Sequence, residues 1–121
     1  MINDRYRTLV HEGQAVLREK ASRFIGIAFP MQDEVAFKLR LLGLEKEHHG
    51  ARHFCFGWVL GDGAERQRAN DAGEPNATAG KPILNRIRSM DLTYCGVVVV
   101  RYFGGTLLGT AGLIKAYGSA A

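Results

Sequence analysis

A chain of 121 residues can form one domain with its own core, and its 46% hydrophobic and 23% charged residues argue against a disordered or fibrous protein. It contains neither a run of 18 apolar residues nor a basic-then-apolar leader, so we expect a cytoplasmic protein without membrane contact. The net charge of +4 lies in residues 79–121, which hold five Lys/Arg against one Asp; this excess favours a polyanionic partner, although a solvated face could also carry it.

The first part of the chain predicts a β-hairpin followed by a helix. Residues 14–19 and 23–28 are rich in apolar residues and flank a polar turn, as in two paired strands. Asp33 then opens a segment of helical periodicity that we expect to run to about residue 44. The apolar residues that recur at helical spacing in this segment are Val35, Leu39 and Leu42.

The middle of the chain predicts a buried strand, a polar turn region and a second helix. Residues 51–60 carry three aromatics and are typical of a strand. Residues 61–73 are rich in turn formers, with room for a short edge strand at 64–68. Pro82 is tolerated only in a first helical turn, so the helix is expected to begin near Thr78. Its apolar stripe consists of Ile83, Ile87 and Met90.

The last part predicts a central strand, a glycine-rich turn and a final helix. Residues 92–102 include four consecutive valines, which suits a strand covered on both sides. Residues 103–112 form the glycine-rich turn, and residues 113–121 begin the helix. Helices follow groups of strands, so we expect an α+β two-layer sandwich with a mixed sheet of four to five strands and helices on one face.

The glycine-rich turn is a candidate anion site. The preceding strand delivers Arg101 into the turn, and free backbone N–H groups at a following helix start attract anions. The alternative is structural, because glycines permit positive φ and close packing. The candidate anion- or nucleic-acid-binding residues here and in the flanking helices are Lys81, Arg101, Gly104, Gly105, Gly109 and Lys115.

The stretch NDAGEPNATAGKPIL is a second candidate site. Its motif residues are Asp71, Gly73, Glu74, Pro75, Thr78 and Gly80. The spacing of its two carboxylates matches no calcium loop, so no metal is expected. Thr78 is predicted to cap the following helix, and Lys81 is then a cation in the first turn, where the helix dipole disfavours it. We therefore expect this helix start to face an anion, or Lys81 to be neutralised by Glu74.

Candidates for catalysis are few. His53 lies among aromatics and is a candidate general base, with Glu74 as an acid, although the residue pattern favours a satisfied core histidine. Cys55 and Cys95 sit in apolar strands, where burial makes a thiol inert, and no signal for a cofactor is present.

Several long segments resemble one protein family. DAGEPNATAGKPIL and VVVVRYFGGTLLGTAGLIKAY are similar to the paired signature of the IMPACT family, whose bacterial members are the YigZ-type proteins. KASRFIGIA and ARHFCFGWVLG are similar to its earlier blocks, so the resemblance covers residues 14–121. Two places depart from the family pattern: Asn76-Ala77 replaces Ser-Gly, and Ala72 replaces an acid.

The resemblance implies a fold and a role. It implies the α+β sandwich of the second domain of ribosomal protein S five, and a single IMPACT-type N-terminal domain spanning residues 1–121. Bacterial relatives usually carry a second, ferredoxin-like domain, and this chain stops where that domain would begin. Eukaryotic relatives restrain the starvation response by competing for the activator of the kinase that phosphorylates initiation factor two.

Three functions remain open at this point. The first is a non-enzymatic, translation-associated regulator that binds RNA, the ribosome or a translation factor through a basic, glycine-rich face. The second is a nucleotide- or phosphate-binding enzyme that uses a cleft between the loop from Asp71 to Lys81 and the turn from Arg101 to Gly112. The third is a protein–protein regulatory module, like the eukaryotic relatives, whose contact is either a strand edge or the aromatic segment of Phe54, Phe56 and Trp58.

Overall fold

The computed structural model describes residues 6–105 and 107–120. The strands are β1 (Gly13–Glu19), β2 (Ser22–Pro30), β3 (His53–Leu60), β4 (Arg66–Asn70) and β5 (Cys95–Tyr102), and the helices are α1 (Glu34–Glu47), α2 (Gly80–Ser89) and α3 (Gly109–Ala120). The predicted α+β class is confirmed. Residue 106 of the predicted glycine turn and residue 121 of the predicted last helix lie outside the described residues.

The five strands form one sheet in the order β1-β2-β5-β3-β4, and every neighbouring pair is antiparallel. The mixed sheet that we predicted is therefore wrong in its strand directions. Helix α1 connects β2 to β3, and helix α2 connects β4 to β5; the two strands of each connection run in the same direction but are not neighbours in the sheet. Each of these pairs has one antiparallel strand between its members, so no parallel strands share hydrogen bonds.

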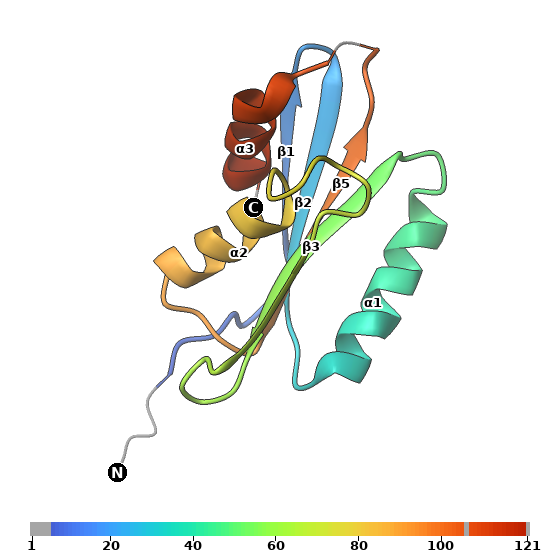
Figure 1. Ribbon diagram of the computed structural model, residues 1–121. Coiled ribbons are helices and arrows are strands. Elements are labelled where there is room, and N and C mark those ends of the chain that lie inside the picture. The colour runs from blue at the N-terminus through green and yellow to red at the C-terminus, as the bar shows by residue number, and fades with distance from the viewer. Residues whose placement is uncertain (1–5, 106, 121) are drawn as a thin grey trace.

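The helices cover both faces of the sheet, which corrects the prediction of helices on one face (Figure 1). Side chains of a strand alternate between the two faces, so each strand supplies both cores. On one face, Phe37 of α1 packs in a cluster with Val98. On the other face, Ile83 of α2 and Tyr117 of α3 pack in a cluster with Val99. The central β5 is thus buried on both sides, as its valine run predicts.

The apolar stripe of α1 that the sequence predicts to be buried faces solvent, and the stripe on the opposite side of the helix packs in the core. Val35 and Leu39 are each 65% exposed, whereas Phe37 and Leu44 are buried. Residues 37, 41 and 44 have the same spacing as residues 35, 39 and 42, so the helix has two apolar stripes on opposite sides. Spacing alone cannot choose between them.

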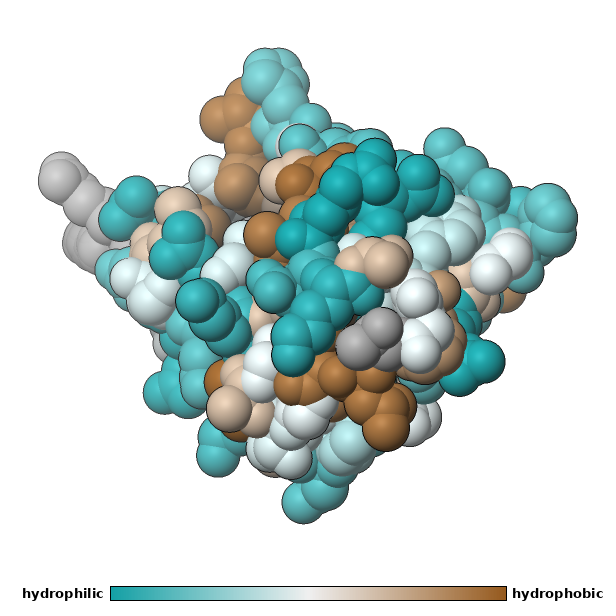
Figure 2. Space-filling view, turned by 90° about the horizontal axis from the view of Figure 1, so that it is seen from above, coloured by the Kyte–Doolittle hydropathy of each residue, from teal (hydrophilic) through white to brown (hydrophobic). Residues whose placement is uncertain are grey.

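None of the described helices is long and apolar enough to cross a membrane. Figure 2 shows the end of the molecule that carries the β1–β2 hairpin, where hydrophilic residues cover a broad central area and hydrophobic residues form separate groups.

The glycine turn after β5 packs directly on the β1–β2 hairpin. A Cβ atom at Gly104 would overlap the backbone of Ala21 and Ser22. We expect Gly104→Ala to lower the free energy of unfolding by roughly 1–3 kcal/mol, because backbone atoms must move apart. Gly13→Ala is the matched control, since a Cβ there meets no atom within 4 Å. Equal thermal midpoints for the two variants would contradict this close contact.

Candidate functional site

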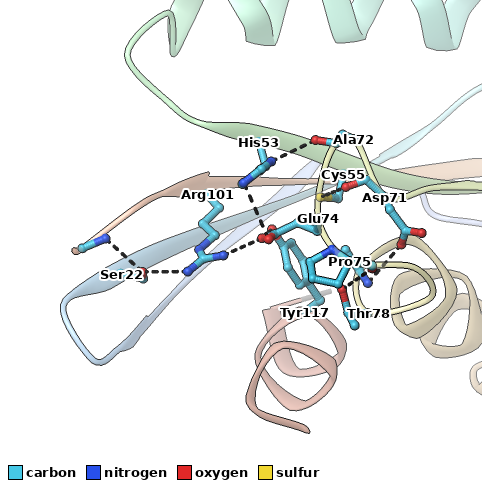
Figure 3. A network of polar contacts seen from close by, with 12 residues as sticks. Ser22, His53, Cys55, Asp71, Ala72, Glu74, Pro75, Thr78, Arg101 and Tyr117 are labelled. Atoms are coloured by element: carbon cyan, nitrogen blue, oxygen red, sulfur yellow. Dashed lines mark hydrogen bonds and ion pairs between the residues drawn. The ribbon is translucent and has the colours of Figure 1, made fainter. Parts of the chain in front are cut away.

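A buried carboxylate, that of Glu74, joins three parts of the fold (Figure 3). Its Oε2 atom accepts a hydrogen bond from Nη1 of Arg101 on β5 at 2.6 Å and another from the hydroxyl of Tyr117 on α3. The Glu74 and Arg101 side chains are each 4% exposed. The loop of residues 71–79 is therefore tied to both the sheet and α3 by a desolvated ion pair.

Arg101 extends this network to the β1–β2 hairpin. Its Nη2 atom donates to Oγ of Ser22 at 3.3 Å, and the same oxygen accepts from the backbone N–H of Gly104 at 3.0 Å. The Arg101 residue as a whole is 3% exposed. The guanidinium that we predicted to face an anion at the surface thus lies inside the protein, where its anion is Glu74.

Two residues of β3 fasten the loop from the other side. His53 Nδ1 lies 2.9 Å from the carbonyl oxygen of Ala72, and because a carbonyl only accepts, this nitrogen carries the hydrogen. His53 Nε2 lies 3.6 Å from Glu74 Oε1. Cys55 Sγ donates to the carbonyl oxygen of Asp71 at 3.0 Å. Burial raises the pKa of Cys55 to about 12, so this thiol stays protonated and inert at neutral pH.

Asp71 caps α2, and the prediction that Thr78 does so is wrong. Asp71 Oδ1 accepts from the backbone N–H groups of Ala79 (3.2 Å) and Gly80 (2.9 Å), and Oδ2 accepts from that of Ala77 (2.9 Å). The Thr78 hydroxyl instead donates to the carbonyl oxygen of Pro75 at 2.6 Å. Burial opposes ionisation of Asp71, but the three hydrogen bonds outweigh it and lower its pKa.

The anion expected at this helix start is therefore one that the protein itself supplies. The Asp71 carboxylate accepts hydrogen bonds from the backbone N–H groups that would otherwise be free to bind an external phosphate. Lys81 is exposed beside it, and Glu74 does not neutralise Lys81 because Glu74 pairs with Arg101.

The remaining glycines serve mainly backbone geometry. Gly73, Gly105 and Gly109 have φ values of +93°, +87° and +75°, a region that other residues rarely adopt. Ala77 has a φ of +61°, which is strained for alanine, and it stands at the position where the resemblance implies glycine.

The polar atoms of this network are engaged in hydrogen bonds and an ion pair within the fold. The catalytic candidates His53 and Glu74 lie together, yet their polar atoms bond to Ala72, Arg101 and Tyr117. The direct Glu74–Arg101 contact fills the space where a cleft between loop and turn was expected. Within residues 6–105 and 107–120, no three His, Cys, Asp or Glu side chains form a group that could hold a metal ion. Sequence reasoning missed Ser22 and Tyr117, which carry no motif of their own.

The exposed cations lie elsewhere, on the helices that cover one face of the sheet. Together α2 and α3 contain no acidic residue, whereas α1 contains three acids and three bases. We call this surface the basic helical layer, and its exposed cations are Lys81, Arg86, Arg88 and Lys115. Among the residues that the structure describes, none of the four forms an ion pair.

Comparison with known proteins gives the same family as the motifs. Residues 20–121 match the sequence model described as the Impact N-terminal domain. The chain belongs to the IMPACT family. It is 44% identical over 101 residues to the IMPACT family member YigZ of Escherichia coli K12, covering 82% of this chain and 50% of that protein. It is 38% identical over 113 residues to the family member YvyE of Bacillus subtilis 168, covering 93% of this chain and 52% of that protein.

Two solved structures share this IMPACT fold. A crystal structure of a hypothetical protein superposes with a TM-score of 0.88 at 38% identity, covering 93% of this chain and 56% of that chain. The structure of Yih1, described as a two-domain translational regulator, has a TM-score of 0.58 at 24% identity, covering 98% of this chain and 49% of that chain. The chain thus spans about half the length of the relatives that it matches.

The buried ion pair of the IMPACT domain predicts a large cost for removing one partner. Arg101→Gln leaves the Glu74 carboxylate buried without its cation, and we expect a loss of about 3–5 kcal/mol in the free energy of unfolding by urea titration. Arg86→Gln removes an exposed arginine and should cost no more than about 0.5 kcal/mol. Comparable losses in the two variants would contradict the assignment of Arg101 to the interior.

The Asp71 cap predicts a pH-dependent contribution to stability. We expect Asp71→Ala to cost roughly 1–2 kcal/mol at pH 7. Because folding lowers the pKa of Asp71, this contribution is present above its unfolded value of about 3.9 and is lost as the pH falls through the lower folded value. The difference in unfolding free energy between wild type and variant should therefore shrink below about pH 4. Glu45→Ala, an exposed change on α1, should show no such cost.

Proposed function

We propose that this chain is a domain of a non-enzymatic, translation-associated regulator that binds RNA, free or in the ribosome, through the basic helical layer. The observation that carries this proposal is the separation of charge. The excess of cations in residues 79–121 is exposed on α2 and α3, apart from the buried Arg101. Such a surface attracts phosphate groups and increases the rate of encounter with a polyanion.

The family supports a role in translation. Yih1 is described as a translational regulator, and at 24% identity it shares the fold of this chain. We carry over its role as part of the proposal, together with a cytoplasmic location. We also infer that the chain corresponds to one IMPACT-type N-terminal domain and that the other half of the relatives' length is a second domain.

The buried network favours binding over catalysis. A general base must reach its substrate, and His53 and Glu74 instead contact the loop and Arg101. The aromatic segment also offers little to a protein partner, because Phe54, Phe56 and Trp58 pack against α1. The exposed cations are the groups best placed to meet a ligand.

The basic helical layer predicts salt-dependent RNA binding. We expect the triple variant Lys81→Gln, Arg86→Gln and Arg88→Gln to weaken binding of single-stranded RNA and to reduce the slope of log Kd against log salt concentration by about 2, at about 0.7 for each lost phosphate contact. Filter binding between low and moderate salt measures both quantities. The control triple is Lys38→Gln, Lys46→Gln and Arg68→Gln, which removes the same charge at exposed positions outside this layer.

The proposal fails if wild type shows no affinity for RNA at low salt. It also fails if the α2 triple keeps the wild-type slope while remaining folded by thermal denaturation.

A further inference from the structure

Three arginines lie side by side at the hairpin end of the sheet. Arg18 on β1 is the register partner of Arg23 on β2, and Arg23 is the register partner of Tyr102 on β5. The backbone N–H of Arg52 donates to the carbonyl oxygen of Arg101 at 2.9 Å, which places Arg52 beside Tyr102 on the β3 side. We call Arg18, Arg23 and Arg52 the arginine row.

The arginine row places positive charges directly opposite each other, and no acidic side chain of the described residues pairs with them. Residues directly opposite on antiparallel strands point to the same face, and a pair of like charges there is destabilising. Glu19, the acid next to Arg18, pairs with Ser22 and so points to the other face. Within the described parts of the chain, none of the three arginines forms an ion pair.

Aromatic rings hold two of these guanidinium groups in place. The Arg23 guanidinium lies 4.4 Å from the centre of the Tyr102 ring, and the Arg52 guanidinium lies 4.5 Å from the centre of the Phe103 ring. The Tyr102 hydroxyl is fixed in turn by His48 Nδ1 at 2.8 Å. Arg23 Nε is buried and lacks a hydrogen-bond partner among the described residues. Guanidinium groups that rest against aromatic rings need little further ordering to receive an anion, whereas the buried Arg23 Nε is not accessible to one.

We propose that the arginine row binds the phosphates of a single-stranded RNA segment. The row crosses three strand spacings, about 14 Å, which is too long for one phosphate and suits a chain of them. An arginine fork matches phosphate oxygens in two parallel hydrogen bonds, and the guanidinium face turned away from its ring can stack on an unpaired base. This arrangement of cations and aromatic rings is typical of sites for single strands.

Arg18 and Arg23 lie on the opposite face of the sheet from the basic helical layer. Arg52 lies beside Phe103 at the end of the sheet, where the same ring is also 5.4 Å from the Arg101 guanidinium. Arg23 and Tyr102 have the same parity as Ile25 and Val100, which lie on the α1 side of the sheet, whereas α2 and α3 cover the other side. The hydrophilic centre of the end view in Figure 2 lies over this hairpin end. The inference shares with the proposed function only the class of ligand.

Fluorescence anisotropy with a labelled oligouridine 12-mer tests the row in the full chain. We expect Arg23→Gln with Arg52→Gln to weaken binding at least tenfold at low salt. The matched control is Arg66→Gln with Arg68→Gln, which removes two exposed arginines of β4 and should change affinity less than twofold. Thermal denaturation verifies that both double variants are folded.

A single exposed change decides the matter should the double variant unfold. Arg18→Glu places an acid opposite Arg23, so we expect it to raise the thermal midpoint while it weakens RNA binding. No loss of affinity in Arg18→Glu, or an equal loss in the row and control variants, overturns the proposal. Competition by inorganic phosphate as effective as oligouridine, at equal phosphate concentration, also overturns it in favour of a single-anion site.

The outcomes separate this inference from the proposed function. Loss of RNA affinity in the α2 triple but not in the row variant removes the row and leaves the basic helical layer. The reverse pattern assigns the RNA contact to the row and removes the layer. Absence of any RNA binding by wild type contradicts both.

Discussion

The pairing of Glu74 with Arg101 is the interaction on which the rest of this structure depends. Removing two charges from water is costly, and the cost is offset only where their remaining atoms also find partners. Glu74 has Tyr117 as a second donor, while Arg101 reaches Ser22 and lies near the rings of Phe24 and Phe103, each at 5.4 Å. The buried Arg101 Nε has no hydrogen-bond partner among the described residues, so the offset is incomplete. We interpret the pair as a device for specificity, because a displaced loop would leave the Arg101 charge in the sheet without its carboxylate.

This internal use of charge determines what is left for binding. Both carboxylates of the loop of residues 71–79 interact within the fold. Glu74 forms an ion pair with Arg101, and Asp71 accepts hydrogen bonds from the start of α2. The loop that the sequence predicts to be a ligand site therefore connects β3, β5, α2 and α3 through its hydrogen bonds. Lys38, Arg40, Arg66 and Arg68 outside this loop also pair with carboxylates. Among the described residues, the exposed cations of α2 and α3 form no ion pair.

The sequence predicts the features that depend on local periodicity. The valine run of β5 and the burial of Ile83 and Ile87 on α2 were predictable because neighbouring residues alone determine them. The third member of the predicted stripe, Met90, follows the end of α2 and is 43% exposed, so that part of the prediction is wrong. The family was predictable because its motifs are long. Strand directions were not, since they depend on where β5 inserts between β2 and β3. The outward stripe of α1 was missed because that helix is apolar on two sides.

The candidate site was harder to predict than the fold, and the reason is distance along the chain. Asp71 caps a helix that begins nine residues later, outside the window in which a cap is normally sought. Arg101 lies on the face shared with Val97 and Val99, but only Tyr117 and the loop of Glu74 close that face over it.

Arg18 and Arg23 differ from Arg101 in having no acidic partner within the described fold. The charge of Arg101 is neutralised by Glu74 inside the protein, whereas Arg18 and Arg23 lie opposite each other and form no ion pair among the described residues. A fold under selection for stability alone has no reason to keep such an opposition, since one acid at residue 18 would relieve it. Cations that contact phosphate groups position a protein on a nucleic acid without reading its bases. Under the two proposals above, phosphate contacts from α2 and from the arginine row would let the domain recognise the shape and charge of RNA rather than its sequence.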